Sequence, residues 1–203
     1  KAIGGKEAIA SIKTMTGDFS MTVQGMNVIM TNSFKAPNKT KSEIKVPQMG
    51  NAVVQASAFD GKKGMQSMQG QTMNADENAN IESNIEGRLV PEMAYAENKV
   101  ITTLLGINKL NGKEVYVIEA IYPTGKKLTL MYDTQSHLKV KEMFVQSTPQ
   151  GDFNITQEFT DYKAINGVLI PHSLSGQQGP QMMVMKLESA EVNKPLKDEM
   201  FKL

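Results

Sequence analysis

The sequence of 203 residues contains no cysteine and no tryptophan, and aromatic residues make up only 6% of it. Without cysteine, a disulfide framework and thiol chemistry are excluded. Positive charge is not in excess, because 22 Lys and Arg stand against 21 Asp and Glu and give a net charge of +1. We therefore expect no nucleic-acid partner. The chain also lacks an apolar run near the ~20 residues of a membrane-spanning helix, so we expect it not to be transmembrane.

Residues that carry out catalysis or hold metals are also scarce. The only two histidines are His137 and His172, and neither has a His, Asp or Glu at ligand spacing on its own predicted strand. No strand-turn-helix serine elbow occurs, and the carboxylates are scattered among turns and surface positions. The sequence thus predicts no metal, no cofactor and no enzymatic activity.

Turn signals divide most of the chain into short β-prone segments. Asn111-Gly112 and Asn166-Gly167 are the strongest signals, because a type I′ turn needs φ > 0 at both central residues, and Asp60-Gly61 is a further one. Strands joined by such short turns are antiparallel neighbours. The segments expected as strands are 15–23, 26–34, 42–46, 52–59, 62–67, 100–110, 114–122, 128–132, 138–145, 153–165, 168–174 and 181–192.

Two regions have helical rather than alternating patterns. Apolar residues recur at helical spacing from Gly4 to Ile12, which predicts a short helix. Between the two strand-rich blocks, 75–97 predicts two short helices, the first opened by an N-cap and the second by Pro91. Their apolar stripes need burial, so we expect them to cover one face of the sheet.

Alternation also predicts which side chains share a face. Phe19, Met21 and Val23 alternate with Ser20 and Thr22. We expect the apolar set, together with Met30 and Phe34 of the next strand, to lie on the concave, helix-covered face.

Methionine is unusually frequent, with 15 residues in the chain. Its flexible, polarizable side chain suits a surface that accepts variable apolar partners. The alternative interpretation is that methionine only fills a core that is poor in aromatic residues.

Several motifs, in their order and spacing, resemble one superfamily. They are Ala2-Ile3-Gly4-Gly5-Lys6, Phe59-Asp60-Gly61-Lys62-Lys63-Gly64, the stretch from Leu110 to Glu119, Tyr132-Asp133, the stretch from Asp161 to Pro171, and the tail containing Phe201. This pattern resembles the outer-membrane lipoprotein-sorting (LolA/LolB-like) superfamily. It is most similar to a branch from Bacteroidetes-type bacteria, in which the domain stands alone or follows insulinase-like zinc protease domains.

The resemblance implies a mainly β (α+β) fold spanning 1–203 as a single domain. Such a domain is a strongly curved, unclosed antiparallel half-barrel of about eleven strands, with short helices over its concave face, and it works in the periplasm. Relatives carry lipid or acyl chains in the hydrophobic cavity. The chain departs from the lipoprotein carrier because it lacks Trp and has a single arginine, Arg88, so no lipoprotein-shuttling residue is carried over. The protease motif is absent as well.

Two functional hypotheses follow. The first is a periplasmic module that binds or transports a lipid-like ligand, such as an acyl chain, between the curved sheet and a helical lid. The second is a non-catalytic interaction or accessory domain with a filled core, serving a protein partner or a linked insulinase-like protease. For the first hypothesis, the predicted ligand-binding residues are Phe19, Met21, Met30, Phe34, Ile85, Leu89, Met93, Met183 and Met185.

Overall fold

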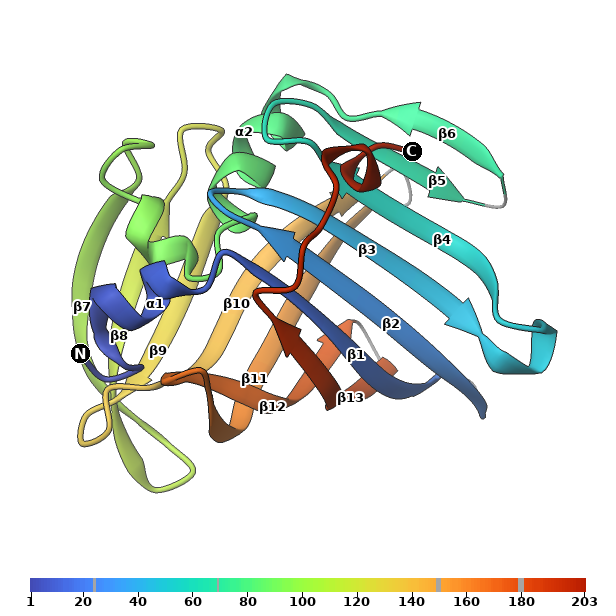
Figure 1. The fold of residues 1–203 in the computed structure, drawn as a ribbon. Coiled ribbons are helices and arrows are strands. Elements are labelled where there is room, and N and C mark those ends of the chain that lie inside the picture. Colours follow the sequence, from blue (N-terminus) through green and yellow to red (C-terminus); the bar gives the residue numbers. More distant parts are fainter. Residues whose placement is uncertain (24, 69, 149–150, 179–180) are drawn as a thin grey trace.

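The structure is a computed structural model that describes residues 1–203 except 24, 69, 149–150 and 179–180. Its described strands form one 13-stranded antiparallel sheet in the order β6-β5-β4-β3-β2-β1-β13-β12-β11-β10-β9-β8-β7. The sheet is curved and not closed, as predicted (Figure 1). The strands are β1 (Thr14–Val23), β2 (Met26–Lys35), β3 (Lys39–Val46), β4 (Ala52–Phe59), β5 (Gly64–Met68), β6 (Gln71–Asn74), β7 (Ile101–Leu110), β8 (Lys113–Ile121), β9 (Lys127–Asp133), β10 (Lys139–Thr148), β11 (Gly151–Ile165), β12 (Val168–Gln178) and β13 (Gln181–Val192).

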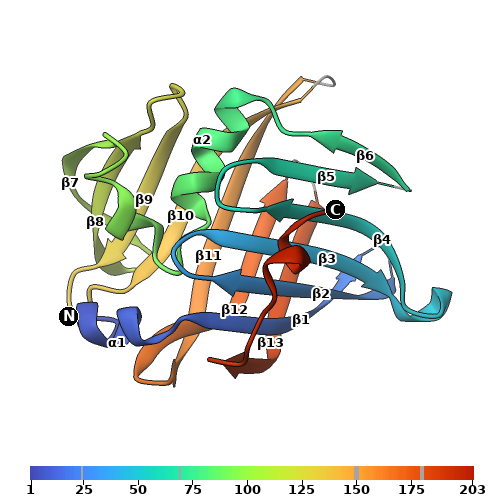
Figure 2. The same ribbon diagram turned by 45° about the horizontal axis from the view of Figure 1, so that its top comes forward.

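The topology follows from two meanders that meet in the middle of the sheet. Strands β1 to β6 pair in sequence order, as do β7 to β13, and β1 pairs with β13. Consequently β6 and β7, which are consecutive in the chain, form opposite edges of the sheet. The connection 75–100 between them has to pass from one edge to the other, and it carries the helices that cover the concave face (Figure 2).

The turn chemistry accounts for the predicted hairpins. Asn111 and Gly112 have φ of 50° and 80°, and Asn166 and Gly167 have 49° and 79°, so both pairs are in the left-handed region. The expected count of about eleven strands is low mainly because β6 is polar and exposed along its four residues. Its pairing with β5, rather than an apolar pattern, makes it a strand.

The helices lie where the sequence predicts them. Helix α1 (Gly5–Ser11) begins after Gly4, whose φ is 112° and where a Cβ would come within 2.2 Å of the Gly167 carbonyl oxygen. Glycine is therefore required for this close approach. Helix α2 (Glu77–Glu86) begins at Asp76, whose side chain accepts a 2.8 Å hydrogen bond from the Ala79 N–H. Short 3-10 turns are η1 (Pro47–Met49), η2 (Pro91–Ala94) and η3 (Asp198–Phe201).

The two helices cover different parts of the sheet. Ile85 of α2 is fully buried and belongs to one cluster of buried residues, whose other members are Tyr95, Ala120, Tyr122, Leu128 and Leu130. Helix α1 packs its Ala8 and Ile9 on a second, smaller cluster of Ile12, Met15 and Val168. The core is thus largest under α2, against β8 and β9.

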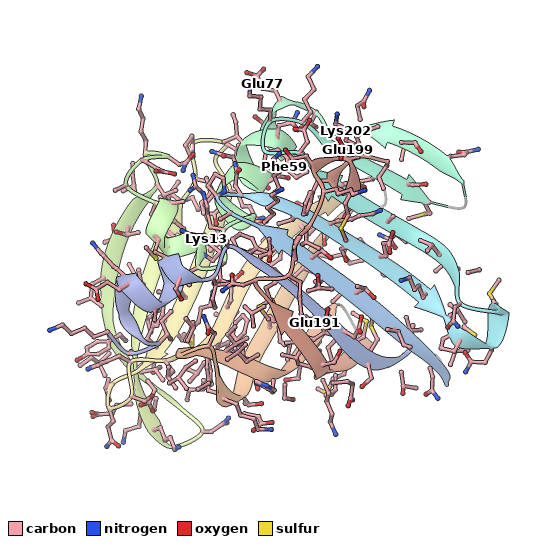
Figure 3. All side chains as sticks on the ribbon, viewed as in Figure 1. Lys13, Phe59, Glu77, Glu191, Glu199 and Lys202 are labelled. Atoms are coloured by element: carbon pink, nitrogen blue, oxygen red, sulfur yellow. The ribbon has the colours of Figure 1, made fainter. Side chains whose placement is uncertain are left out.

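The C-terminal tail covers the other face of β1 to β4. Phe201 is 1% exposed, and Asp198 forms ion pairs with Lys35 (2.7 Å) and Lys39 (2.9 Å). Figure 3 shows Glu199 and Lys202 of this tail beside Phe59 at the end of β4. The tail therefore closes a side of the sheet that the helices leave uncovered.

Candidate functional site

Strand register defines the concave face, on which α1 and α2 pack. Met15 pairs with Phe34, and Phe19 pairs with Met30 along the same two strands. Because alternate residues share a face, these four side chains lie on the face that α1 covers at the Met15 end. Ser20 lies on the opposite face, as the alternation predicts, and its hydroxyl donates to Glu188.

Strand β13 continues this face past the middle of the sheet. Met185 pairs with Met21, and Leu187 pairs with Phe19. Met183 and Met185 are partly buried, whereas the alternate residues Met182 and Val184 are exposed. We call the concave surface of β13, β1 and β2 from Phe19 to the free end of these strands the open side, because its methionines and Phe19 belong to neither core cluster.

A cleft of about 340 Å³ lies between the open side and the end of α2. Its apolar wall is formed by Met15, Phe19, Phe34 and Leu89, and the volume falls in the range of small-ligand sites. Its remaining lining is polar: Gly17, Asn32, Ser33, Thr40, Lys41, Ser42, Ser57, Glu86, Gly87 and Arg88.

Charged residues, among them Glu86 and Arg88, therefore share the lining of this cleft with the apolar wall. Glu86 at the end of α2 forms an ion pair with Lys126, and Arg88, two residues after the helix, forms one with Glu97. The Nε–H of Arg88 is buried and has no acceptor among the described groups.

A second hollow, of about 950 Å³, lies at the free end of the β1–β2 hairpin. It combines Met21 and Val28 of the concave set with residues of the opposite face. The other lining residues are Ser20, Thr22, Asn27, Ile29, Pro47, Gln48, Met182, Val184 and Lys186.

The structure brings together some of the nine predicted ligand-binding residues. Phe19, Phe34 and Leu89 line the cleft, and Met21 lines the second hollow. Met30, Met183 and Met185 share the concave face but line neither of these two hollows.

Two of the predicted residues lie elsewhere. Ile85 is fully buried in the core between α2 and the sheet, so a ligand could touch it only by displacing that packing. Met93, on η2, is 47% exposed. The apolar stripe of a helix does not indicate which strands the helix packs against. The surroundings of these two residues could therefore not be predicted from that stripe alone.

A network of charges that sequence reasoning missed fixes α2 and η2 to the sheet. Lys126 pairs with Glu86 (2.6 Å) and Glu82 (3.3 Å). Its ammonium also lies 4.8 Å from the centroid of the Phe144 ring. We call β8, β9 and β10 together with α2 and η2 the filled side.

The second half of the network is centred on Lys139. This side chain pairs with Glu142 (3.0 Å) and with Glu92 of η2 (3.1 Å), and Glu92 also accepts a 2.8 Å hydrogen bond from the Tyr132 hydroxyl. Two features of the sequence could have predicted this network. Charged residues occur in β10, a strand with an otherwise half-buried pattern, and glutamates are spaced four apart in α2.

Burial and pairing shift the pKa values in this network. Burial raises the pKa of Glu86, and the Lys126 ammonium reduces that shift without cancelling it. For Glu92 burial also raises the pKa, but Lys139 and the hydrogen bonds outweigh it and hold the pKa below its ordinary value. Burial would lower the pKa of Lys139, yet Glu92 and Glu142 raise it. The pair of Lys139 and Glu92 is therefore charged at neutral pH.

The described residues contain no group of three or more His, Asp or Glu placed to hold a metal ion. His172 Nδ1 lies 3.0 Å from the Ile170 carbonyl oxygen, and the His137 ring stacks on Tyr116 with centroids 6.2 Å apart. Both rings thus have local structural contacts. No helix in the described part of the chain is long and apolar enough to cross a membrane.

Comparison with known proteins identifies the fold. No protein-family model and no curated protein matches the sequence. Among solved structures, a LolA superfamily protein from Nitrosomonas europaea aligns over 97% of this chain and 95% of its own, with a TM-score of 0.64 and 14% identity. An outer-membrane lipoprotein-sorting protein domain from Vibrio parahaemolyticus aligns over 96% and 93%, with a TM-score of 0.62 and 15% identity.

A DUF1329 family protein from Desulfovibrio piger gives a similar match. It covers 97% of this chain and 92% of its own, with a TM-score of 0.65 and 10% identity. At such identities the likeness establishes fold and not function. The chain therefore has the fold of the LolA/LolB-like lipoprotein-sorting superfamily, as its motifs predict.

Proposed function

We propose that this protein is a non-catalytic periplasmic module that binds a lipid-like or other hydrophobic ligand on the concave side of its sheet. The observation that carries the proposal is the incomplete cover of that side. Helix α2 packs Ile85 into the filled side, and α1 packs on Met15, short of the open side. Phe19, Met21 and Met30 are left partly exposed on a concave apolar surface.

The cleft beside α2 suggests how such a ligand would be held. Apolar contact with Phe19, Phe34 and Leu89 would supply most of the binding free energy, since burial of apolar surface scales with area. The unpaired Nε–H of Arg88 would donate a hydrogen bond to an acceptor oxygen of the ligand. Methionines further along the open side would adapt to acyl chains of different shape. The shared fold with lipoprotein-sorting proteins agrees with this function.

Two neighbouring residues of β13 offer a matched test. Met185 lies on the open side, and Val184, 44% exposed, lies on the opposite face of the same strand. We expect Met185→Lys to weaken binding of a fluorescent fatty acid at least tenfold, because a charge would enter the apolar surface. Val184→Lys should bind as the wild type does. Solvent extraction of the purified protein followed by mass spectrometry would identify a retained ligand.

Other outcomes of this test count against the proposal. Loss of binding in Val184→Lys alone would place the ligand in the second hollow and not on the open side. The absence of both a retained lipid and saturable binding in the wild type would contradict the proposed function itself.

The alternative, an interaction or accessory domain, is favoured by one observation at the sheet edge. Edge strand β7 carries four exposed aliphatic side chains: Ile101 (63%), Leu104 (61%), Leu105 (59%) and Ile107 (60%). A bulge between Leu104 and Gly106 interrupts the edge. If this edge binds a protein partner, Leu104→Lys should abolish binding of that partner. Fatty-acid binding should stay at the wild-type level.

A further inference from the structure

Eleven of the 15 methionines belong to β1, β2, β5, β6, β13 and the β3–β4 turn, and five of them gather around one position. On the open side, Met21 pairs directly with Met185 of β13 and with Val28 of β2. The residues two positions on from these partners include Met183, Met26 and Met30. Met21 therefore has one methionine opposite and three on its diagonals.

This spacing lets thioether sulfurs meet. Directly opposed residues in an antiparallel pair have Cβ atoms roughly 4.5–5.5 Å apart, and diagonal neighbours about 7–8 Å, within reach of long side chains. Three sulfurs bound to one metal at about 2.3 Å each need to approach one another to roughly 4 Å. Met21, Met185 and one diagonal methionine stand at cross-strand positions whose Cβ spacing their long side chains can span toward a shared ion.

Packing alone does not demand this arrangement. Leucine, isoleucine or valine would fill an apolar face with better-defined rotamers, and methionine specifies such a face poorly. The five side chains belong to neither core cluster, and Met26 is 46% exposed. Met21, Met183 and Met185 are partly and not fully buried, so a solute can reach this face.

The surroundings select the class of ion. Cross-strand neighbours of this group are apolar or small: Phe19, Val23, Val28, Leu174, Gly176 and Leu187. No carboxylate or imidazole lies among these described neighbours, so hard cations and zinc would find no ligands. Neutral thioethers instead suit soft monovalent ions, of which Cu(I) is the biological example.

We propose that Met21, Met185 and at least one of Met26, Met30 and Met183 form a binding site for a soft monovalent cation of the Cu(I) and Ag(I) class. The expectation of no metal was based on histidine and carboxylate ligands, and thioethers lie outside that reasoning. The proposal is independent of hydrophobic-ligand binding, because leucine at these positions would keep the surface apolar and remove every sulfur.

The test replaces sulfur while keeping volume. Cu(I) is titrated anaerobically in competition with bicinchoninate, and Ag(I) is titrated while methionine methyl resonances are followed by NMR. We expect one ion per chain, with the largest shifts at Met21 and Met185, and at least tenfold weaker Cu(I) binding in Met21→Leu and in Met185→Leu. Met65→Leu is the matched control, since Met65 is a partly buried strand residue whose cross-strand partners are Ala58 and Asn74.

Several outcomes would overturn the proposal. Equal loss in Met21→Leu and Met65→Leu, or many weak ions spread over all methionines, would show that no site is built here. Fatty-acid titration and circular dichroism of the same variants separate this result from misfolding. In the wild-type protein, fatty-acid binding without Cu(I) binding rejects the metal site alone, whereas Cu(I) binding without fatty-acid binding rejects only the proposed function.

Discussion

The filled side and the open side have the same alternation of apolar and polar residues along their strands, but only the filled side has its apolar face covered by a helix. On the filled side, Ile85 of α2 clusters with Ala120 and Leu130, which are 0% and 1% exposed. Lys126 pairs with Glu86 of α2, and Lys139 pairs with Glu92 of η2. On the open side the apolar face of β1 and β13 meets no helix beyond Met15. The comparison teaches that one short helix can fill one half of a curved sheet while the apolar face of the other half stays outside the core clusters.

The largest expected effect comes from opening the filled side. Ile85→Ala should lower the free energy of unfolding by about 2–5 kcal/mol, because the removed methyl groups leave a cavity in a fully buried core. Met185→Ala on the open side should lower it by less than about 1.5 kcal/mol, since its partly exposed side chain loses less buried area. Urea unfolding measures both. Equal losses would erase the distinction between the two sides.

A smaller effect is expected from the charges that fix the helical segment. Lys139→Met removes the partner of Glu92 and Glu142, and should cost roughly 1–3 kcal/mol, below the about 3–5 kcal/mol of a fully buried pair because both ends retain some exposure. Lys163→Met breaks an exposed pair with Asp161 and should change stability by less than about 0.5 kcal/mol. A Lys139→Met protein as stable as the wild type would show that the apolar contacts alone hold η2.

The same network predicts opposite pH dependences for two glutamates. Glu92 has a folded-state pKa below its ordinary 4.5, so it contributes stability above that value, which is lost as the pH falls through the folded pKa. Glu86 has a raised pKa, so its contribution decreases as the pH rises from 4.5 through the folded pKa.

The measurement compares unfolding of each variant with the wild type between about pH 3 and pH 7. The stability difference between wild type and Glu92→Gln should grow with pH. The difference between wild type and Glu86→Gln should decrease over the same range. Parallel trends would contradict the assigned environments of the two carboxyl groups.

These results also show how far the sequence leads. Alternation and turn chemistry predict most of the sheet, the helices and the concave position of Phe19, because each depends on neighbours in the chain. The position of Ile85 depends on which strands the connection 75–100 crosses, and this follows from the pairing of β1 with β13. Lys139 and Glu92 meet for the same reason, so contacts between distant segments were the part that local patterns could not predict.

The smallest expected effect concerns the outer face behind the open side, where the tail carrying Phe201 takes the place of a helix. Hydrogen bonds from Lys35 and then Lys39 lower the pKa of Asp198 to about 2. Its contribution to stability is therefore complete above the ordinary pKa of 3.8 and is lost as the pH falls toward 2.

Asp198→Asn should lower stability slightly at pH 7, remove that pH dependence, and speed hydrogen exchange in 194–203. Glu199→Gln, which alters a charge on the same turn without touching these lysine pairs, is the control. Because the Asp198 side chain is 57% exposed, solvent screens its ion pairs, and the effect stays local. If Asp198→Asn instead speeded hydrogen exchange in β1 and β13 as well, the tail would stabilise the strands of the open side. The open side would then be stabilised from its outer face by the tail, as the filled side is stabilised from its concave face by α2.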